Sequence, residues 1–219
     1  LIVQIYKVGA PSIVVQAIGS LMTYGMNLIL AAFGSAQTVF GIYFKLQSFV
    51  FMPVFGLNNG MVPIIAYNYG AGHKDRVIKT IKHSVAYGVG IMFVGLLAMH
   101  IFPAQLMRMF DAEESLIAIG APALETISLS FVFAGFCIVA GSVFQALGNG
   151  VYSMIVSVAR QMCVLLPVAK LLSLSGEVTL IWWAFPIAEL ASVLLTSYFL
   201  VRIYRKVICH IGEPVVQDA

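Results

Sequence analysis

The chain has 219 residues, of which 61% are hydrophobic and only 10% are charged, and its mean hydropathy is +0.99. A soluble globular domain carries about 25% charged residues, so this composition excludes an ordinary soluble protein and favours lipid as the surrounding solvent. The formal net charge of +3 is small, and the basic residues stand beside apolar runs. Nucleic acid is therefore not expected as a partner, whereas membrane lipid is.

The apolar runs discriminate between the two structures that can cross a bilayer, a helical bundle and a closed β-barrel. Barrel strands are about 10 residues long and alternate apolar with polar side chains. The runs here do not alternate and are about as long as a spanning helix requires, roughly 20 residues. We therefore expect an all-α, polytopic membrane protein.

Six spans are predicted in chain order. They cover approximately residues 8–33, 38–68, 78–102, 119–147, 152–174 and 179–203. Turn-forming residues separate them at 34–35, 70–72, 148–150 and 173–176. The spans define an expected transmembrane lobe over residues 1–205 and a tail over 206–219. Because the chain starts at Leu1 and not at methionine, we expect a fragment of a longer protein.

Two spans have features of their own. The second is too long for a simple crossing, since 30 residues would extend about 45 Å against a hydrocarbon core of about 30 Å. It contains Pro53 and Pro63, which predict either a static kink or a hinge. Before the fourth span, Asp111 and Glu114 have the spacing of a capping box, which predicts a short surface helix.

The basic residues of the short loops predict the orientation, since cytoplasmic loops are enriched in Lys and Arg. Arg108, with Lys170 nearby, falls on one side. The other side holds Lys7, Lys74, Arg76, Lys79, Lys82, Arg202, Arg205 and Lys206. That side is expected to be cytoplasmic. Six crossings would then leave both ends of the chain in the cytoplasm, in a protein expected in the cell membrane.

Polar residues form a stripe along the first span. Gln16 is followed by Ser20, Thr23 and Asn27 at offsets of 4, 7 and 11 residues, so all four fall within about 40° of one line on a helix. Such residues either hydrogen-bond to other helices or line a cavity for a solute. The second span contains Asn59, with Asn58 beside it, and Lys45. These residues could likewise hydrogen-bond to other helices or line a solute cavity. Lys45 could instead extend to the outer interface.

Glu189 is the most notable carboxylate, because it lies about 9 Å beyond Trp183 along the sixth span. Desolvation disfavours a charged carboxylate, so a buried glutamate can exchange a proton near neutral pH, which suits proton-coupled transport. The other interpretation is a glutamate satisfied by a neighbouring helix or an open vestibule. Glu125 is a second candidate, nearer the outer surface. Arg160 is expected to reach the inner interface or to pair with an acid.

No pattern of catalytic or metal-binding residues stands out. The four histidines are scattered and lack metal-ligand spacing, and neither a G-x-S-x-G elbow nor a P-loop lysine occurs. The sequence therefore predicts neither an enzyme nor a bound cofactor.

Several short motifs resemble those of multidrug and toxic compound extrusion (MATE) transporters. The run Pro-Ile-Ile-Ala-Tyr-Asn-Tyr-Gly-Ala-Gly over 63–72, followed by Lys74 and Arg76, resembles the loop after the eighth helix. The segments 52–56, 7–11 and 145–149 resemble parts of the eighth, the seventh and the tenth helix. Their order and spacing extend the resemblance over nearly the whole chain.

The resemblance implies that these are helices seven to twelve of a twelve-helix transporter whose N-terminal six-helix lobe is missing here. It implies export of organic cations and drugs in exchange for protons or sodium ions, by rocking of two lobes. Gln16, Thr23, Asn27, Lys45 and Asn59 would then bind substrate, and Glu189 and Glu125 would couple the cation. Members with sodium-linked sites carry acids where approximate matching puts Gly19 and Ala134, so that site would be absent or moved.

Two other functions fit the same composition. A flippase for a lipid-linked oligosaccharide would favour a basic cavity. A membrane receptor or assembly subunit would need no transport path.

Overall fold

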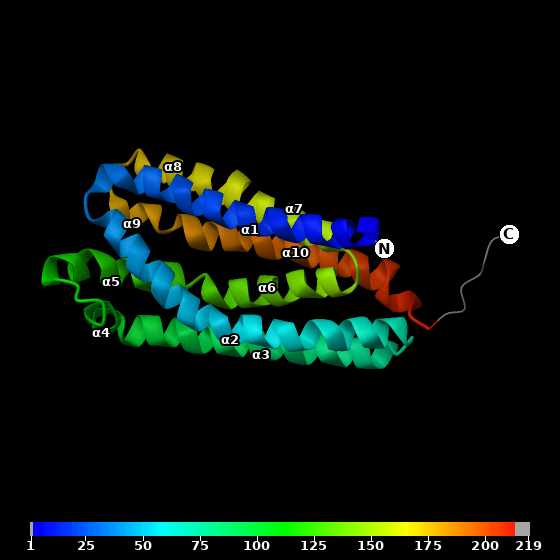
Figure 1. The fold of residues 1–219 in the computed structure, drawn as a ribbon. Helices are drawn as coiled ribbons and strands as arrows, with labels where there is room; N and C mark the ends of the chain where they lie inside the picture. The colour runs from blue at the N-terminus through cyan, green and yellow to red at the C-terminus, as the bar shows by residue number, and fades with distance from the viewer. Residues whose placement is uncertain (1, 213–219) are drawn as a thin grey trace.

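The computed structural model describes residues 2–212, with side chains from Gly9 onward, and the described chain is helical almost throughout (Figure 1). In chain order the elements are α1 (Ile2–Leu30), η1 (Ala31–Phe33), α2 (Ala36–Gly70), α3 (Lys74–Ile101), α4 (Pro103–Arg108), α5 (Glu114–Ser128), α6 (Phe131–Ala146), α7 (Gly150–Val158), η2 (Ala159–Leu165), α8 (Leu166–Ser173), α9 (Val178–Ile181), α10 (Ala184–Lys206) and η3 (Ile208–His210). The all-α prediction is confirmed.

Helix length and surface character fit a membrane. Within residues 2–212, five helical segments are long and apolar enough to cross a bilayer, and α5 with α6 makes a sixth if that bent pair is one span. Large apolar side chains project outward from them, among them Phe49, Met52 and Leu194, each more than 70% exposed. A soluble monomer rarely exposes so much apolar surface. The protein is therefore a multi-pass membrane protein.

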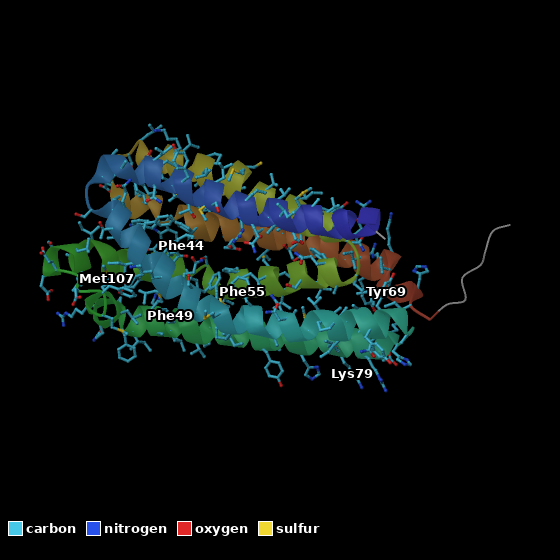
Figure 2. All side chains as sticks on the ribbon, in the orientation of Figure 1. Phe44, Phe49, Phe55, Tyr69, Lys79 and Met107 are labelled. Atoms are coloured by element: carbon cyan, nitrogen blue, oxygen red, sulfur yellow. The ribbon has the colours of Figure 1, made fainter. Side chains whose placement is uncertain are left out.

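The helices run up and down in one bundle (Figure 1). Helix α2 packs on α3, α3 on α6, α6 on α10, and α10 on η2, while α1 lies along α7 and α8. The N-terminus, the α2–α3 turn and the end of α10 lie at the same end of the bundle, where Tyr69 and Lys79 are found, and Met107 lies at the other end (Figures 1 and 2). Gly34, Gly72, Gly148 and Gly176 each have positive φ in the predicted turns.

Helix α2 is one continuous helix of 35 residues that contains both prolines. At about 1.5 Å per residue it would extend roughly 50 Å, more than a bilayer core is thick. Figure 1 shows how the length is accommodated, since the helix first crosses from the end of α1 and then turns to run beside α3. A proline removes one backbone donor and clashes with the preceding turn, which makes such a bend inexpensive.

The predicted fourth span contains a break, because α5 and α6 meet at a bend of 48°. Ser128 and Ser130 flank the break, and each hydroxyl donates to a backbone carbonyl three residues earlier, at Glu125 and Ile127. Serine hydroxyls that bond locally in this way compete with the helical ladder. The sequence shows the two serines but not that they act together as a break.

The predicted capping box was wrong. Helix α5 begins at Glu114 with Glu113 as its N-cap, and Asp111 lies in a turn with φ of 54°. The Glu114 carboxylate instead accepts a hydrogen bond of 2.8 Å from Arg108, at the end of the short helix α4. A short helix, α4, does precede the span, but it ends at Arg108, before Asp111.

The fifth and sixth spans contain irregularities that the sequence did not reveal. Residues 159–165 of the fifth form a π-helical segment, η2, a wider turn that is often found at functional sites. In the sixth, a turn at 182–183 separates α9 from α10. Trp182 is fully buried there and only Trp183 is exposed, so only one of this pair has the exposure of an interfacial tryptophan.

The predicted tail is partly packed. Up to Gly212 it folds back onto the α2–α3 turn, where Lys74 Nζ donates a 2.8 Å hydrogen bond to the carbonyl of Cys209. Ile208 and Ile211 are buried. Residues 213–219 of the predicted tail lie outside the described residues.

Two glycines allow α3 and α6 to approach closely. A Cβ added at Gly88 would lie 2.6 Å from Val139 Cγ2, and one at Gly135 would lie 3.0 Å from the carbonyl oxygen of Gly88. Small residues at such contacts let helix backbones pack in the absence of a strong hydrophobic force between them. This contact holds α6 beside the α2–α3 pair.

Replacing Gly88 by valine should therefore destabilise the protein by about 1–3 kcal/mol, the usual cost of overpacking. Gly90 provides a matched control in the same helix, because nothing lies within 4 Å of its added Cβ. Thermal unfolding of the purified protein in detergent would measure both. Equal loss of stability in Gly88→Val and Gly90→Val would contradict this account of the packing.

Candidate functional site

A cavity of about 660 Å³ lies among α1, α2, α6, α7, η2 and α10. Its lining mixes aromatic and aliphatic side chains with many polar ones. The polar and charged lining residues are Gln16, Gln47, Asn58, Asn59, Ser130, Ser142, Gln145, Ser153, Ser157, Arg160, Gln161, Glu189, Ser192 and Thr196. Such a mixture, enclosed by helices whose outer faces are apolar, is the pattern expected of a solute cavity in a membrane protein.

Three of the seven predicted site residues line this cavity. Gln16 from α1 and Asn59 from α2 are exposed and stand at its rim, whereas Glu189 from α10 is only 5% exposed. Of the polar stripe predicted on α1, only Gln16 therefore lines the cavity.

Thr23 and Asn27 lie on α1 away from the cavity lining. The Thr23 hydroxyl donates to the carbonyl of Gly19, and the Asn27 amide donates to the carbonyl of Thr23. Both side chains thus bond to their own helix, as hydroxyl and amide groups in apolar helices commonly do. The Asn27 backbone carbonyl also accepts a 2.7 Å hydrogen bond from the Gln37 side-chain amide, which ties α1 to the start of α2.

Lys45 and Glu125 also lie off the cavity lining. The Lys45 ammonium stands 5.6 Å from the ring centroid of Phe110, beside the α4–α5 connection. This is the direction expected of a lysine that reaches the interface. Glu125 is half-buried on α5, and among the described residues its carboxylate has no hydrogen bond or ion pair.

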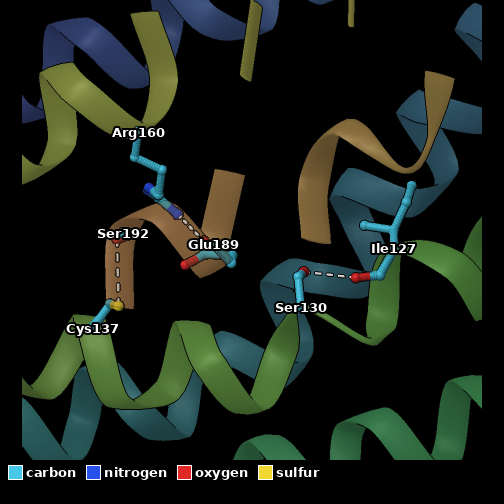
Figure 3. Close-up of polar contacts among 6 residues, drawn as sticks. All are labelled: Ile127, Ser130, Cys137, Arg160, Glu189 and Ser192. Atoms are coloured by element: carbon cyan, nitrogen blue, oxygen red, sulfur yellow. Dashed lines mark hydrogen bonds and ion pairs between the residues drawn. The ribbon is translucent and has the colours of Figure 1, made fainter. Parts of the chain in front are cut away.

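The centre of the cavity wall is an ion pair between α10 and the π-helical segment. Arg160 donates a hydrogen bond from a terminal nitrogen to Oε1 of Glu189 (Figure 3). The Glu189 side chain is 7% exposed and that of Arg160 is 29% exposed, and both residues line the cavity. Of the two interpretations of Arg160, pairing with an acid is confirmed.

Several cavity atoms lack a partner. Among the described residues, five buried side-chain polar atoms make no hydrogen bond, and three of them belong to the cavity lining: Asn58 Oδ1, Glu189 Oε2 and Thr196 Oγ1. Buried polar atoms are rarely left without a partner in a folded protein, because each costs free energy. Three of these five atoms thus belong to residues of the cavity wall.

Sequence reasoning missed part of this site. Tyr43 and Cys137 line the cavity, and Cys137 Sγ accepts a 3.4 Å contact from the hydroxyl of Ser192 (Figure 3). Ser192 and Thr196 were not missed, because their offsets of 3 and 7 from Glu189 put them on the same helical face. Tyr43 and Cys137 stand in apolar runs and carry no comparable signal.

Comparison with known proteins identifies the chain. The MatE family model matches residues 11–171, well over half of the sequence. The chain belongs to the MatE family. The resemblance drawn from the short motifs is thereby confirmed, and MatE proteins are transporters and not enzymes.

The chain is similar to known transporters in both sequence and structure. The multidrug export protein MepA of Staphylococcus haemolyticus (strain JCSC1435) is 26% identical over 93% of this chain, and MepA of Staphylococcus aureus (strain N315) is 27% identical over 85%. The structure of the MATE multidrug transporter DinF-BH is 33% identical, with a TM-score of 0.81 over 94% of this chain. The Vibrio cholerae MATE transporter VcmN shares the fold, with a TM-score of 0.86 at 17% identity.

The chain spans about half the length of these proteins, 45% of the Staphylococcus haemolyticus MepA and 46% of the DinF-BH chain. It is thus one lobe of a MatE transporter. Gly19 and Ala134, matched to the acids of sodium-linked members, both line the cavity. The cavity therefore has its charges elsewhere on its wall, at Arg160 and Glu189.

The ion pair makes a prediction about stability. Replacing either Arg160 or Glu189 by glutamine should destabilise the protein more than the double replacement does, because each single change leaves one charge in the cavity wall without its partner. We expect an interaction energy of about 1–3 kcal/mol from the double-mutant cycle.

The exposed pair of Arg108 and Glu114 is the matched control, since its side chains are 59% and 79% exposed. The same cycle there should give about 0–1 kcal/mol. Thermal unfolding of all variants in one detergent would measure both cycles. Equal interaction energies for the two pairs would show that the cavity pair is no stronger than a surface contact.

Proposed function

We propose that this chain is one lobe of a secondary active exporter of bulky amphipathic solutes, including organic cations and drugs. The main support for the proposal is the cavity. A polar space of about 660 Å³ between apolar helices is expected in a protein that binds a solute and not in one that only spans the bilayer. The names of the relatives support it, since the MepA proteins are multidrug export proteins and DinF-BH is a multidrug transporter.

The lining suits solutes of varied structure. Phe44, Phe51 and Phe55 from α2 and Phe185 from α10 offer flat apolar surfaces. Polar side chains such as Gln16 and Asn59 can donate and accept hydrogen bonds from the rim. A few adaptable polar groups among aromatic rings allow many amphipathic solutes to bind without strict geometry.

Export against a gradient requires coupling, and we propose that an inward flow of protons or sodium ions supplies it. Glu189 is the first candidate for the coupling group, because it is the carboxylate of the cavity wall. Glu125 is the second, since its half-buried carboxylate has no ion-pair partner within the described residues. No tightly bound cofactor is needed for this mechanism.

The transport cycle is proposed to use two lobes that open alternately to each side of the cell membrane. The exposed side chains of Gln16, Ser20 and Asn59 would then face the missing N-terminal lobe. With the basic end of the bundle in the cytoplasm, both ends of this chain are on the cytoplasmic side. Thr23 and Asn27 contribute to substrate binding only if the second lobe brings solute to their part of α1.

No observation favours the other two functions. A flippase for a lipid-linked sugar would be served by a basic cavity, but Lys45 points away from it and Arg160 is paired. A receptor without transport gains no support from the matched relatives, which are named as export or transport proteins.

The export function is tested by removing the rim groups. Gln16→Leu and Asn59→Leu should each reduce drug export several-fold, because each takes one hydrogen-bonding group from the solute path. Ser48→Ala is the control on α2, since Ser48 is exposed and bonds only to the carbonyl of Phe44. Dye efflux from cells that produce equal amounts of full-length protein would be measured. Unchanged efflux in both leucine variants would exclude this cavity as the path.

The coupling is tested in vesicles with defined gradients. Export should stop when either the proton gradient or the sodium gradient is collapsed by its ionophore, and persist when the other is. Glu189→Gln should lose gradient-driven export while Glu125→Gln keeps it, if Glu189 is the coupling group. Export that survives the collapse of both gradients would contradict secondary active transport.

A further inference from the structure

A second hollow, the outer groove, lies between α2 and α3 on the outside of the bundle. It has a volume of about 480 Å³ and shares no lining residue with the polar cavity. Helix α2 lines it only with glycines and large apolar side chains, whereas every residue that α3 contributes is polar or carries a polar tip. One wall of the outer groove is therefore apolar, and the other can bond to a polar group.

The outer groove is elongated along the helices. On each helix, three exposed lining residues stand four positions apart. They are Gly56, Gly60 and Ile64 on α2, and Lys79, His83 and Tyr87 on α3. Because the two helices pack side by side and are joined by a short turn, these residues form three levels, at about 8, 14 and 20 Å from the turn. The groove thus runs in the direction that an acyl chain takes in a bilayer.

The glycines leave open space along the apolar wall. Nothing lies within 4 Å of a Cβ added at Gly56 or at Gly60. Leu57 and Met61 line the groove beside them. Hydrocarbon surrounds the spanning part of these helices, so an acyl chain is the apolar group available to fill this space.

The polar wall has a positive charge and a buried hydroxyl that are both unpaired. Lys79 is exposed and makes no ion pair within residues 9–212. The Thr80 hydroxyl and the His83 ring bond to carbonyls one turn earlier. Ser84 is only 5% exposed, and its hydroxyl makes no hydrogen bond within the same residues. A buried serine in a helix commonly bonds to its own backbone, so this hydroxyl is left for a partner in the groove.

The depth of these groups matches the headgroup region of a bilayer. Helix α3 has 28 residues. It extends about 42 Å, so if centred it passes each face of a 30 Å core by about 6 Å. Lys79 is about 8 Å from the start of α3, at the edge of the hydrocarbon, where its ammonium can extend to the phosphates. Figure 2 shows it near the basic end of the bundle. Ser84 lies about 7 Å deeper, where ester groups and the first acyl carbons follow the phosphate.

We infer that the outer groove binds one anionic glycerophospholipid from the leaflet at the basic end of the bundle. Lys79 binds the phosphate, Ser84 donates to an ester carbonyl, and an acyl chain lies along Gly60 and Gly56. Basic pockets between membrane helices are typical sites for anionic headgroups. In the proposed orientation this leaflet is the cytoplasmic one. The inference does not rest on the proposed export function.

Lipid binding to the purified full-length protein tests the inference. Palmitoyl-oleoyl-phosphatidylglycerol and palmitoyl-oleoyl-phosphatidylcholine have the same acyl chains, and only the first has a net negative charge. Native mass spectrometry of delipidated protein in a neutral maltoside detergent would measure both affinities. The protein should bind phosphatidylglycerol about tenfold more tightly, the effect of one charged hydrogen bond. Glycerol 3-phosphate, which has the phosphate without the chains, should not displace it even in large excess.

Two variants should separate the headgroup from the chain. Lys79→Gln should abolish the preference for phosphatidylglycerol and leave the affinity for phosphatidylcholine unchanged. Gly60→Leu fills the groove and should weaken both lipids several-fold. Ser84→Ala should weaken both to a smaller extent, because it removes one neutral hydrogen bond. Loss of folding would not spare phosphatidylcholine binding in Lys79→Gln.

Lys82→Gln and Gly41→Leu are the matched controls. Lys82 is exposed on α3 and Gly41 on α2, and neither lines the groove. Nothing lies within 4 Å of a Cβ added at Gly41, as at Gly60. Both variants should keep the wild-type affinities.

Four results would overturn the inference. They are equal wild-type affinities for the two lipids, displacement by glycerol 3-phosphate, wild-type binding in both Lys79→Gln and Gly60→Leu, and binding of neither lipid. In the last case another part of the protein fills the groove. Dimers that Gly60→Leu dissociates would then identify a second copy as the occupant, and monomers would identify the missing lobe.

Discussion

Hydrocarbon as the solvent is the constraint from which the rest of this structure follows. Hydrocarbon cannot hydrogen-bond, so each backbone N–H and C=O must have a partner inside the protein. The described chain meets this requirement by being helical almost throughout. The same solvent gives little driving force for helix association. Close approach at Gly88 and Gly135 supplies contact where hydrophobic burial cannot.

Polar side chains have only two inexpensive positions in such a bundle, and this chain uses both. Some bond to a carbonyl of their own helix, as Thr23, Asn27 and Ser48 do. Others line the cavity, as Gln16, Asn59 and Glu189 do. The first group stabilises its own helix and the second is available to a solute. The residue types alone do not tell which residue belongs to which group.

The irregular parts of the helices coincide with the cavity. The π-helical segment presents Arg160, the α5–α6 bend leaves Ser130 on the lining, and the long helix α2 changes direction while contributing residues from Tyr43 to Pro63. Each departure costs some regular bonding, and each places a group that a straight helix would direct elsewhere. These irregular segments therefore all contribute to the polar lining of the cavity.

The sequence by itself determined the solvent, the helical class, the approximate spans and the family, because hydropathy, turn residues and short motifs are local properties. It also singled out Gln16, Asn59 and Glu189, which line the cavity, because polar residues in apolar runs are conspicuous in a sequence. Only the tertiary structure decided that Thr23, Asn27, Lys45 and Glu125 stand off the cavity and that Glu189 meets Arg160, 29 residues earlier. Those outcomes depend on helix rotation, the serine break and the π-helical turn, which arise from contacts between helices and leave no periodic signal in the chain.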